Sequence, residues 1–350
     1  MPLAGADVGA VALRCSTTGL AKQHQLGIDR ASETTVTITH DVPHSPEVGI
    51  LMCTFQGGRH VVAQLESIAA QTHPRWRLWA SDDGSTDDTL ANLGRYRSQW
   101  GADRLSVIRG PSAGFAANFR SLTCRAEIDA DFFAWADQDD IWQPDKLQRA
   151  LAWLQSVPPG VPALYGTRTL LTDGDDQPIG MSPLFTRPPS FANALVQCIA
   201  GCNTMVFNQA ARELFIQASA EGDAVPPDWL MYLLVAGCEG RVHYDPLPSV
   251  RYRQHGQNLS GSNLSLRGRW QRARLLMGGE FRSWVDANLE RLAQVSHRMP
   301  AHHLAVLDEF AQARQRHLPG RLIGFWRSGI HRQTALGNLG LSVAALFNKL

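Results

Sequence analysis

Two short stretches of this sequence crowd carboxylates together. In WADQDDIW, Trp135 to Trp142, the residues Asp137, Asp139 and Asp140 fall within four positions. Like charges this close repel, and removing each carboxylate from water costs on the order of several kcal/mol unless a cation compensates its charge. Asp137 and Asp139 form a DxD element, whose oxygens suit Mg²⁺ or Mn²⁺ and leave coordination places for diphosphate oxygens. The alternative for any DxD is a solvated turn, and Asp140 can equally be structural.

A second acidic pair, Asp82 and Asp83, stands in the turn-rich stretch DDGSTDDT. One of the two can accept a hydrogen bond from a base N–H or a ribose hydroxyl, as acidic residues do at the ends of nucleotide-binding strands. The alternative is an Asx turn that leads into a helix cap at residues 85–87. The sequence has no GxGxxG or GxxxxGK[ST] motif, so phosphate binding would depend on a metal.

Both acidic groups follow strands in a regular alternation of strands and helices. Apolar runs without a helical period predict buried strands, and apolar residues at helical spacing predict the helices between them. Strands are predicted at 48–55, 75–81, 105–109 and 131–136, and helices at 61–69, 88–100 and 116–126. This alternation predicts a parallel sheet covered by helices on both faces, with ligands beyond the carboxyl ends of its strands. The two groups should therefore converge on one cleft.

The following part of the chain is less regular. Helices are predicted at 144–154 and 208–219, strands at 162–171 and 203–207, and loop structure over 173–190. Another helix is predicted to begin at Asp228, and an alternating stretch up to Arg253 indicates a strand. From about residue 265 the apolar residues return to helical spacing.

The order of four motifs makes the chain similar to a known family. The motifs are TFQGGRHVVAQLESIAAQTHPRWRLWASDDGSTDDT, WADQDDIWQPDKL, PPDWLMYLLVAG and YRQHGQNLSG, over about residues 48–261. They resemble family 2 glycosyltransferases, most closely the bacterial group that includes rhamnosyltransferases of cell-surface polysaccharide synthesis. The resemblance implies an α/β GT-A fold, a nucleotide-diphosphate sugar donor, Mg²⁺ or Mn²⁺, and inversion at the anomeric carbon.

The resemblance also assigns roles at the donor side. It implies that Asp83, or Asp82, holds the nucleoside, that Asp137 lies near the ribose and that Asp139 is the direct metal ligand. In YRQHGQN, His255 resembles a histidine that reaches the metal or the diphosphate. Two arginines of the preceding strand are also placed to meet phosphate; they are Arg251 and Arg253.

At the acceptor side, Asp228 matches the family's catalytic base in its Asp-Trp motif. Inverting transfer needs one base to take the proton of an acceptor hydroxyl as that oxygen attacks opposite the leaving diphosphate. The alternative for a carboxylate at a helix start is an N-cap. Pro227 stands where the family usually has His or Glu, which puts the local geometry in question. Trp229 and Asn203 are further acceptor-side candidates, although core packing is the commoner role of a tryptophan.

Composition narrows the class of protein. With 350 residues, 44% hydrophobic and 19% charged, the chain can build a large core, and a formal net charge of +1 argues against a nucleic-acid-binding surface. The six cysteines form no CxxC pair, which indicates reduced thiols rather than a zinc site. No run reaches about 18 apolar residues, and the N-terminus makes a poor signal peptide, so we expect a cytoplasmic protein.

We expect three segments: a mobile extension at 1–46, the glycosyltransferase domain at 47–262 and a basic helical extension at 263–350. Residues 265–350 carry 13 Lys or Arg against 5 Asp or Glu. Such an apolar and basic mix can lie on the inner face of the cell membrane, and the alternative is a helical appendage with a solvated basic face.

The sequence leaves the substrates open. A dTDP- or UDP-linked sugar, rhamnose among them, and a saccharide or lipid-linked acceptor all fit the motifs. A nucleotidyltransferase-like metal enzyme and a non-catalytic carbohydrate-binding module on the same fold are the rival functions.

Overall fold

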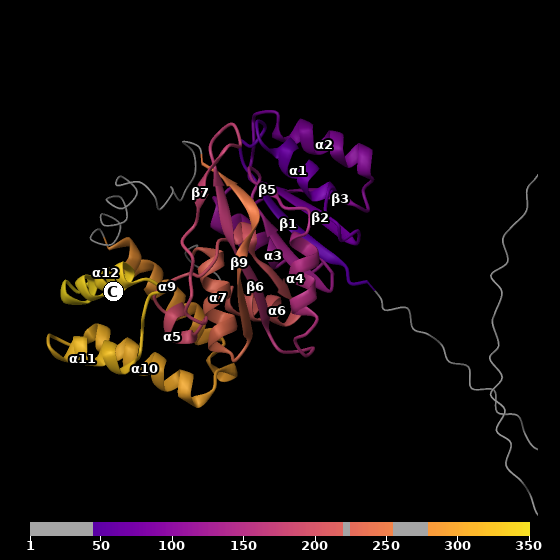
Figure 1. Cartoon of the computed structure of the whole chain (residues 1–350). Coiled ribbons are helices and arrows are strands. Elements are labelled where there is room, and N and C mark those ends of the chain that lie inside the picture. The colour runs from indigo at the N-terminus through magenta and orange to yellow at the C-terminus, as the bar shows by residue number, and fades with distance from the viewer. Residues whose placement is uncertain (1–44, 220–224, 255–278) are drawn as a thin grey trace, which may run out of the picture. The chain divides into compact units, whose positions relative to one another are not determined.

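The computed structural model describes residues 45–219, 225–254 and 279–350 (Figure 1). The predicted extension at 1–46 falls almost wholly outside these residues, as does His255. The predicted domain boundaries stay predictions.

The first half of the described chain alternates strands and helices as expected. Its strands are β1 (Val48–Thr54), β2 (Trp76–Asp82), β3 (Leu105–Arg109) and β4 (Phe132–Ala136). Its helices are α1 (Val61–Ala69), α2 (Thr89–Trp100) and α3 (Phe115–Thr123). The four strands are parallel, in the order β3-β2-β1-β4. The predicted parallel sheet is therefore confirmed here.

The second half extends this sheet with mixed pairing. Its strands are β5 (Ile141–Trp142), β6 (Ala163–Thr172), β7 (Pro178–Met181), β8 (Val206–Asn208) and β9 (Arg241–Arg253), and its helices are α4 (Lys146–Leu154), α5 (Phe191–Ala194), α6 (Gln209–Ala218) and α7 (Pro227–Gly237), with the 3₁₀ helix η1 (Cys202–Thr204). β8 runs antiparallel to both β4 and β6, and β9 runs parallel to β6. The longest ladders in the sheet are parallel, so the mostly parallel α/β class is confirmed.

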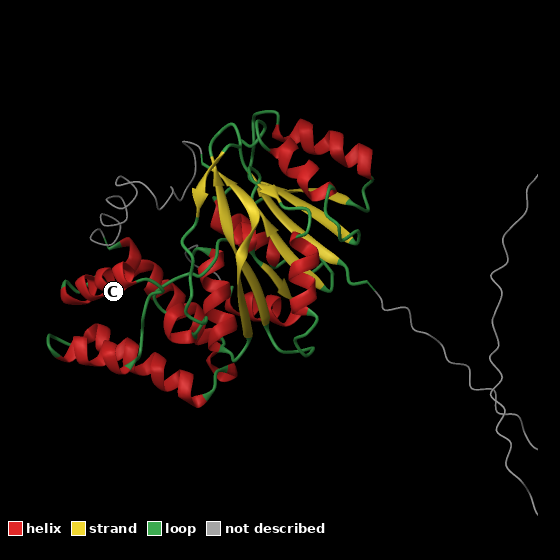
Figure 2. Ribbon diagram, in the orientation of Figure 1, coloured by secondary structure: helices red, strands yellow, loops and turns green. Residues whose placement is uncertain are grey.

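The sheet is the middle of three layers (Figure 2). Along β1, Ile50 and Met52 pack into a core with α1, α2 and α4, whereas Leu51 and Cys53 pack into the core on the other face. This period of two places a buried strand between two apolar layers. The second core includes α3, α5, α6 and α7, together with apolar residues of the C-terminal helices.

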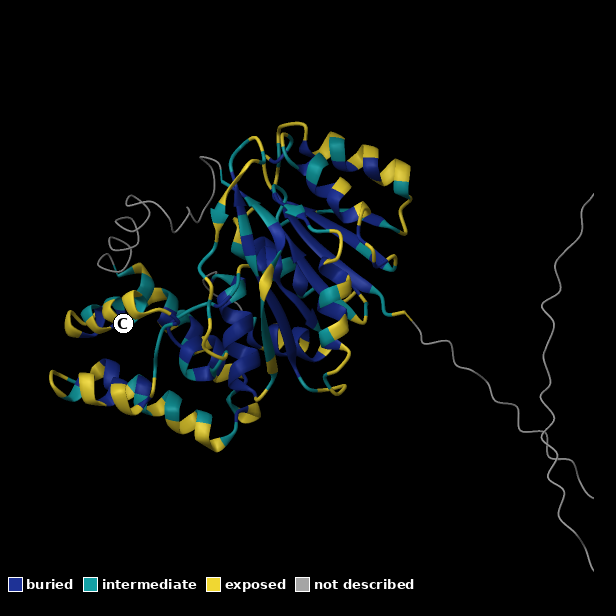
Figure 3. Ribbon diagram, in the orientation of Figure 1, coloured by how far each residue is buried: buried dark blue, intermediate teal, exposed yellow. Residues whose placement is uncertain are grey.

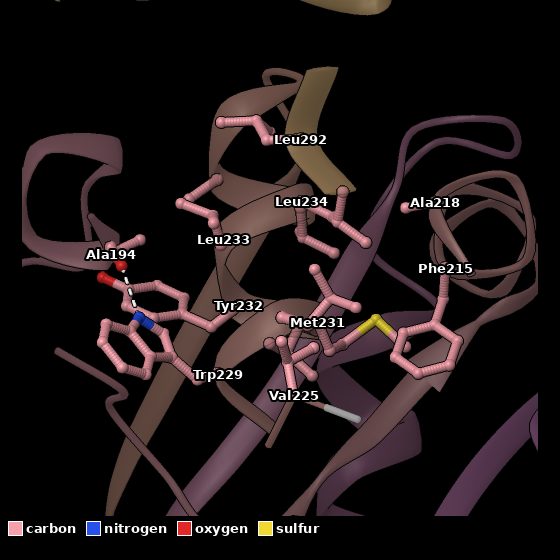
Figure 4. Close-up of a cluster of buried hydrophobic side chains, with 14 of the residues drawn as sticks. Ala194, Phe215, Ala218, Val225, Trp229, Met231, Tyr232, Leu233, Leu234 and Leu292 are labelled. Carbon is pink, nitrogen blue, oxygen red and sulfur yellow. Dashed lines mark hydrogen bonds between the residues drawn. The ribbon is translucent and has the colours of Figure 1, made fainter. Parts of the chain in front are cut away.

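The C-terminal extension is helical, as the periodicity predicts. Its elements are α9 (Glu280–Gln294), η2 (Ser296–Arg298), α10 (Ala301–Gln315), α11 (Gly320–Arg327) and α12 (Ala335–Leu346). Leu292 of α9 packs among the side chains of α7 (Figure 4). Among the described residues, no helix has both the length and the apolar character needed to cross a membrane.

Two details differ from the sequence-based expectation. The stretch 173–190 is not all loop, because β7 pairs antiparallel with β6 through Leu170 and Met181. Helix α7 begins at Pro227 rather than at Asp228. Proline suits a first helical position because its missing N–H has no partner to lose there.

Candidate functional site

The register of the sheet brings the two acidic groups to one edge. β1 lies between β2 and β4, with Thr54 opposite Asp82 and Met52 opposite Ala136. The thiol of Cys53, near the end of β1, lies within the field of both groups: its pKa is raised by burial, then by Asp137 and then by Asp83. The predicted convergence of the two acidic groups is therefore observed.

Asp82 is 3% exposed and its oxygens are fully engaged by the protein. Oδ1 accepts from the backbone N–H groups of Gly84 and Ser85 at 3.1 and 2.8 Å. Oδ2 accepts from the hydroxyls of Thr54 and Ser85 at 2.8 and 2.7 Å. The turn of the alternative interpretation is observed, and it makes Asp82 the anchor of the loop that follows β2. The helix cap expected at residues 85–87 is wrong, because the N-cap of α2 is Asp88, whose side chain makes no capping hydrogen bond.

Asp83 holds a different loop. Its Oδ1 and Oδ2 accept from the backbone N–H groups of Ser112 and Gly114 at 2.6 and 2.8 Å. A Cβ at Gly110 would come within 2.8 Å of Asp83 Oδ1, so the loop passes too close for any side chain there. Asp83 thus joins the end of β2 to the segment that precedes α3. A contact of either aspartate with a nucleoside stays a prediction.

The middle residue of the DxD element is locked in place. The side-chain amide of Gln138 accepts from the N–H of Phe55 and donates to its carbonyl, both at 2.8 Å. A Cβ at Gly57 would overlap Gln138 Oε1, so glycine leaves room for this arrangement. The flanking Asp137 and Asp139 are half-buried.

Three carboxylates share the field around this loop. The pKa of Asp137 is raised to about 7, first by burial and then by the charges of Asp139 and Asp228, against the lowering effect of Lys146. Burial also raises the pKa of Asp228 to about 6, against the lowering effect of nearby hydrogen bonds. The interactions on Asp137 show that the base candidate and the DxD element occupy one site.

Helix α7 fixes Asp228 because the rest of this helix is buried. Every residue from Trp229 to Gly237 packs inside the protein, and Trp229 Nε1 donates to the carbonyl of Ala194 at 2.7 Å (Figure 4). Pro226 is the N-cap, and no side chain caps the helix. Asp228 Oδ1 accepts a local bond from the Trp229 N–H at 2.8 Å, and the thiol of Cys198 is a second hydrogen-bond partner of the Asp228 carboxylate. The N-cap alternative for Asp228 is therefore not observed.

A buried cluster that sequence reasoning missed underlies the DxD loop. Lys146 is fully buried, its ammonium lies 3.6 Å from the centroid of the Trp142 ring, and it donates to the carbonyl of Asn203. The amide of Asn203 donates to Asp140 Oδ2 at 2.6 Å. Burial lowers the pKa of Lys146, and the charges of Asp140 and Asp137 oppose that shift. The signal was present: Lys146 stands four residues before Ala150, on the apolar face of α4.

The buried cluster also accounts for Asp140, for which the sequence left a structural role and a metal contact open. The side chain is fully buried, and burial, Asp139 and Asp137 raise its pKa. Its Oδ1 has no hydrogen-bond partner among the described residues. Asp140 therefore supports the loop from below, together with Asn203 and Lys146.

The two acceptor-side candidates are also inside the protein. Asn203 is 4% exposed and Trp229 is 6% exposed. Trp229 stacks on Phe281 with a centroid separation of 5.4 Å. Their surroundings give both residues supporting contacts, and a direct contact with an acceptor stays a prediction.

The arginines of β9 lie next to the DxD loop because Arg251 pairs with Ile141 in the β5–β9 ladder. Arg253 Nε donates to the carbonyl of Asp139 at 3.3 Å. Arg251 forms an ion pair with Asp176 at 2.6 Å. The structure brings both arginines toward the site, and their contact with phosphate stays a prediction.

The donor set suits a hard divalent cation. Asp137 and Asp139 offer carboxylate oxygens on one loop, and a bound cation would favour the charged form of Asp137, whose pKa is raised mainly by burial. Within the described ranges, no group of three or more His, Cys, Asp or Glu side chains is arranged to hold a metal. The arrangement fits an ion held by one or two carboxylates and completed by substrate phosphates and water.

The sequence is similar to those of known proteins. Residues 50–215 match the family model described as Glycosyl transferase family 2. The chain is 26% identical over 259 residues to the dTDP-rhamnosyl transferase RfbG of Shigella flexneri, which covers 70% of this chain and 86% of that protein. It is 24% identical over 162 residues to the UDP-Glc:alpha-D-GlcNAc-diphosphoundecaprenol beta-1,3-glucosyltransferase WfgD of Escherichia coli, covering 46% of this chain and 60% of that one.

Among solved structures, the chain is similar to the mannosyltransferase PcManGT from Pyrobaculum calidifontis, in complex with GDP-Man and Mn²⁺. The TM-score is 0.48 at 16% identity, covering 87% of this chain and 88% of that chain.

Proposed function

Because this chain belongs to glycosyl transferase family 2, and so is a glycosyltransferase of the GT-A type, we propose that it transfers a sugar with inversion at the anomeric carbon. The donor is a nucleotide-diphosphate sugar, and the acceptor is a hydroxyl of a saccharide or lipid-linked glycan. The observation that carries the proposal is the half-buried Asp228, which shares one electrostatic field with the DxD element.

Asp228 is suited to act as the base. Its pKa of about 6 lies close enough to neutral pH for a carboxylate that takes a proton in the transition state. The acceptor oxygen forms a bond to the anomeric carbon while its proton passes to Asp228. The bond from that carbon to the diphosphate breaks, and its electron pair leaves with the diphosphate. A single displacement of this kind inverts the anomeric centre.

The DxD element is the proposed metal site. Asp137 and Asp139 would hold Mg²⁺ or Mn²⁺, and such an ion would stabilise negative charge on the leaving diphosphate. Gln138 sets the position of both aspartates through its amide pair with Phe55. The buried Lys146 limits the repulsion between the carboxylates when the ion is absent.

The names of two relatives support specific donors and an acceptor. RfbG is named as a dTDP-rhamnosyl transferase, and this supports dTDP-rhamnose as the first donor to test. WfgD is named for UDP-Glc and a diphosphoundecaprenol acceptor, which supports a lipid-linked acceptor and keeps UDP-sugars as alternative donors. We accordingly place the reaction in polysaccharide synthesis at the cytoplasmic face of the cell membrane.

Donor turnover tests the proposed function. Purified full-length protein is incubated with dTDP-rhamnose or UDP-sugars, a lipid-linked saccharide, and either Mn²⁺ or EDTA. We expect a glycosylated product of inverted configuration with Mn²⁺ and none with EDTA. A product of retained configuration would refute the inverting mechanism. Equal turnover in EDTA would refute the dependence on a metal. Exchange of labelled pyrophosphate into the donor, without transfer, would identify a nucleotidyltransferase instead.

A further inference from the structure

Helix α11 exposes apolar side chains on the face that points away from the core. Leu322, Ile323 and Trp326 are 37%, 47% and 81% exposed. Their spacing places them on one side of the helix, while Gly324 and Phe325 pack inward. In an ordinary surface helix this outer face would be polar.

Helix α12 repeats the pattern. Leu336, Leu339 and Leu346 are 63%, 61% and 46% exposed, and Phe347, just past the helix end, is 61% exposed. Leu341, Ala344 and Ala345 form its buried face. Both helices therefore carry an outer apolar stripe (Figure 3). Contiguous exposed apolar surface on a folded protein marks a place where something else binds.

The two helices are tied to each other. Arg321 donates from Nε to the carbonyl of Arg316 and from Nη1 to the carbonyl of Ala345, at 3.1 and 3.2 Å. The side chain of Thr334 caps α12 through the Gly337 N–H at 3.0 Å. The exposed stripes are thus a fixed surface of the fold.

The charge of the segment that carries these stripes is positive, although Arg314 and Arg316 within it are paired with Asp286 and Glu309 of the preceding helices. Residues 310–350 contain six Lys or Arg and no Asp or Glu. Arg327 is exposed at the end of α11, and Lys349 is half-exposed after α12. An apolar stripe bordered by cations matches the boundary of an anionic bilayer, where acyl chains accept the apolar groups and headgroups accept the cations.

We propose that the outer faces of α11 and α12 form a docking surface for an anionic phospholipid bilayer. We call the residues Leu322, Ile323, Trp326, Leu336, Leu339, Leu346 and Phe347 the lipid-facing surface. A symmetric pairing of this surface with its own copy fits less well, because the segment 310–350 has no Asp or Glu side chain to meet the cations of the other copy. The inference goes beyond the transfer reaction, since it depends on these helices and not on the acidic site.

Vesicle flotation of the full-length protein tests the inference. One set of vesicles contains phosphatidylcholine alone, and the other contains about 30% phosphatidylglycerol. We expect flotation with the anionic vesicles and at least a severalfold weaker binding to the neutral ones. Raising the salt from about 50 mM to 500 mM should release much of the bound protein, because salt screens the attraction to the headgroups.

A matched pair of triple variants separates docking from general surface change. Trp326→Gln, Leu336→Gln and Leu339→Gln together remove three exposed apolar groups of the lipid-facing surface. Ile179→Gln, Leu184→Gln and Leu247→Gln remove three other exposed apolar groups, at 48%, 45% and 62% exposure. Partitioning of an apolar side chain changes binding by roughly tenfold. The first variant should therefore lose binding by tenfold or more, and the second should float as the wild type does.

Several outcomes would overturn the inference. These are no flotation of the wild type, equal binding of the two variants, or a concentration-dependent dimer that the first variant abolishes. The last outcome would assign the surface to a second copy. Transfer to a short, water-soluble acceptor should be unchanged in the first variant, so a failure of the docking surface and a failure of the proposed reaction would be distinguished.

Discussion

The two acidic groups at the carboxyl edge of the sheet differ in what surrounds their oxygens. Asp82 and Asp83 accept six hydrogen bonds from nearby backbone and hydroxyl groups. In the second group, by contrast, the pKa of Asp137 is raised to about 7, mainly by burial. Asp228, at the start of α7, has its pKa raised to about 6 for the same reason. Hydrogen bonds within the protein therefore stabilise the carboxylates of Asp82 and Asp83. The charged forms of Asp137 and Asp228 are instead destabilised, and a bound cation or a proton from the substrate can compensate their charge.

The largest expected effect concerns Asp228, at the start of α7, whose charge acts on Asp137 of the second group. Asp228→Asn should lower the transfer rate by about 10² to 10⁴, because an amide cannot accept the acceptor proton. Donor binding should persist, since the DxD element is untouched. The checks are single-turnover kinetics and the rise in melting temperature that donor plus Mn²⁺ produces. Full activity in this variant would remove the base assignment.

The next effect concerns Lys146, the buried cation beneath the DxD loop. Lys146→Met should cost about 3–5 kcal/mol of folding free energy, because it leaves buried carboxylates without a counter-charge. Adding Asp140→Asn should recover part of the loss, since it removes one of those charges. Urea unfolding of the single and double variants measures this, with the half-exposed Lys349→Met as control. Equal stability of both Lys variants would contradict this role for Lys146.

A smaller effect contrasts the two groups directly in the metal-free protein. Asp82→Ala should lower stability by about 2–3 kcal/mol, because buried donors lose their acceptor. Asp137→Asn should leave stability unchanged or raise it, because it removes a poorly solvated charge, while abolishing the stabilisation by Mn²⁺. Thermal unfolding with and without Mn²⁺ tests both. The comparison between the groups fails if the two substitutions destabilise equally.

A further effect is a pH dependence of the metal-free protein. The folded pKa values of Asp137 and Asp228 lie above the unfolded value near 3.8, so the folded state binds more protons between about pH 4 and pH 7. Their contribution to stability is fully present below the unfolded pKa and is lost as pH rises through about 6 to 7. Melting curves from pH 5 to 8 should show this decline in the wild type. Asp137→Asn should show a shallower decline, and a steeper one would reverse the assigned sign.

Much of the fold was predictable because its signals are local. β1, β2 and β4 are short, largely apolar runs that are mostly buried, β3 is a partly buried edge strand, and the acidic motifs come at or directly after the ends of β2 and β4. Because these strands pair in parallel, both motifs lie at the same edge of the sheet, and this placement does not depend on how the later part of the chain folds. The helical C-terminal segment carries the same kind of local periodicity.

What surrounds the site was harder to predict because it depends on distant residues. Asp140 and Asn203 are 63 positions apart, and their hydrogen bond exists only because β8 joins β4 antiparallel. The role of Asp82 as a loop anchor likewise needs Thr54, 28 positions earlier. In both cases the sequence shows the residue types, and only the fold determines which carboxylates are already satisfied.

The amide pair between Gln138 and Phe55 has a consequence for how such a sequence can vary. The Gln138 side chain makes a pair of hydrogen bonds with Phe55 just beyond the last residue pair of the β1–β4 ladder. A glutamine is long enough to span the distance from residue 138 to the Phe55 backbone. Gly57 must stay small for the same reason. The two positions are therefore coupled: a side chain at 57 would require Gln138 to move out of its pairing with Phe55, and a shorter amide at 138 would no longer reach Phe55.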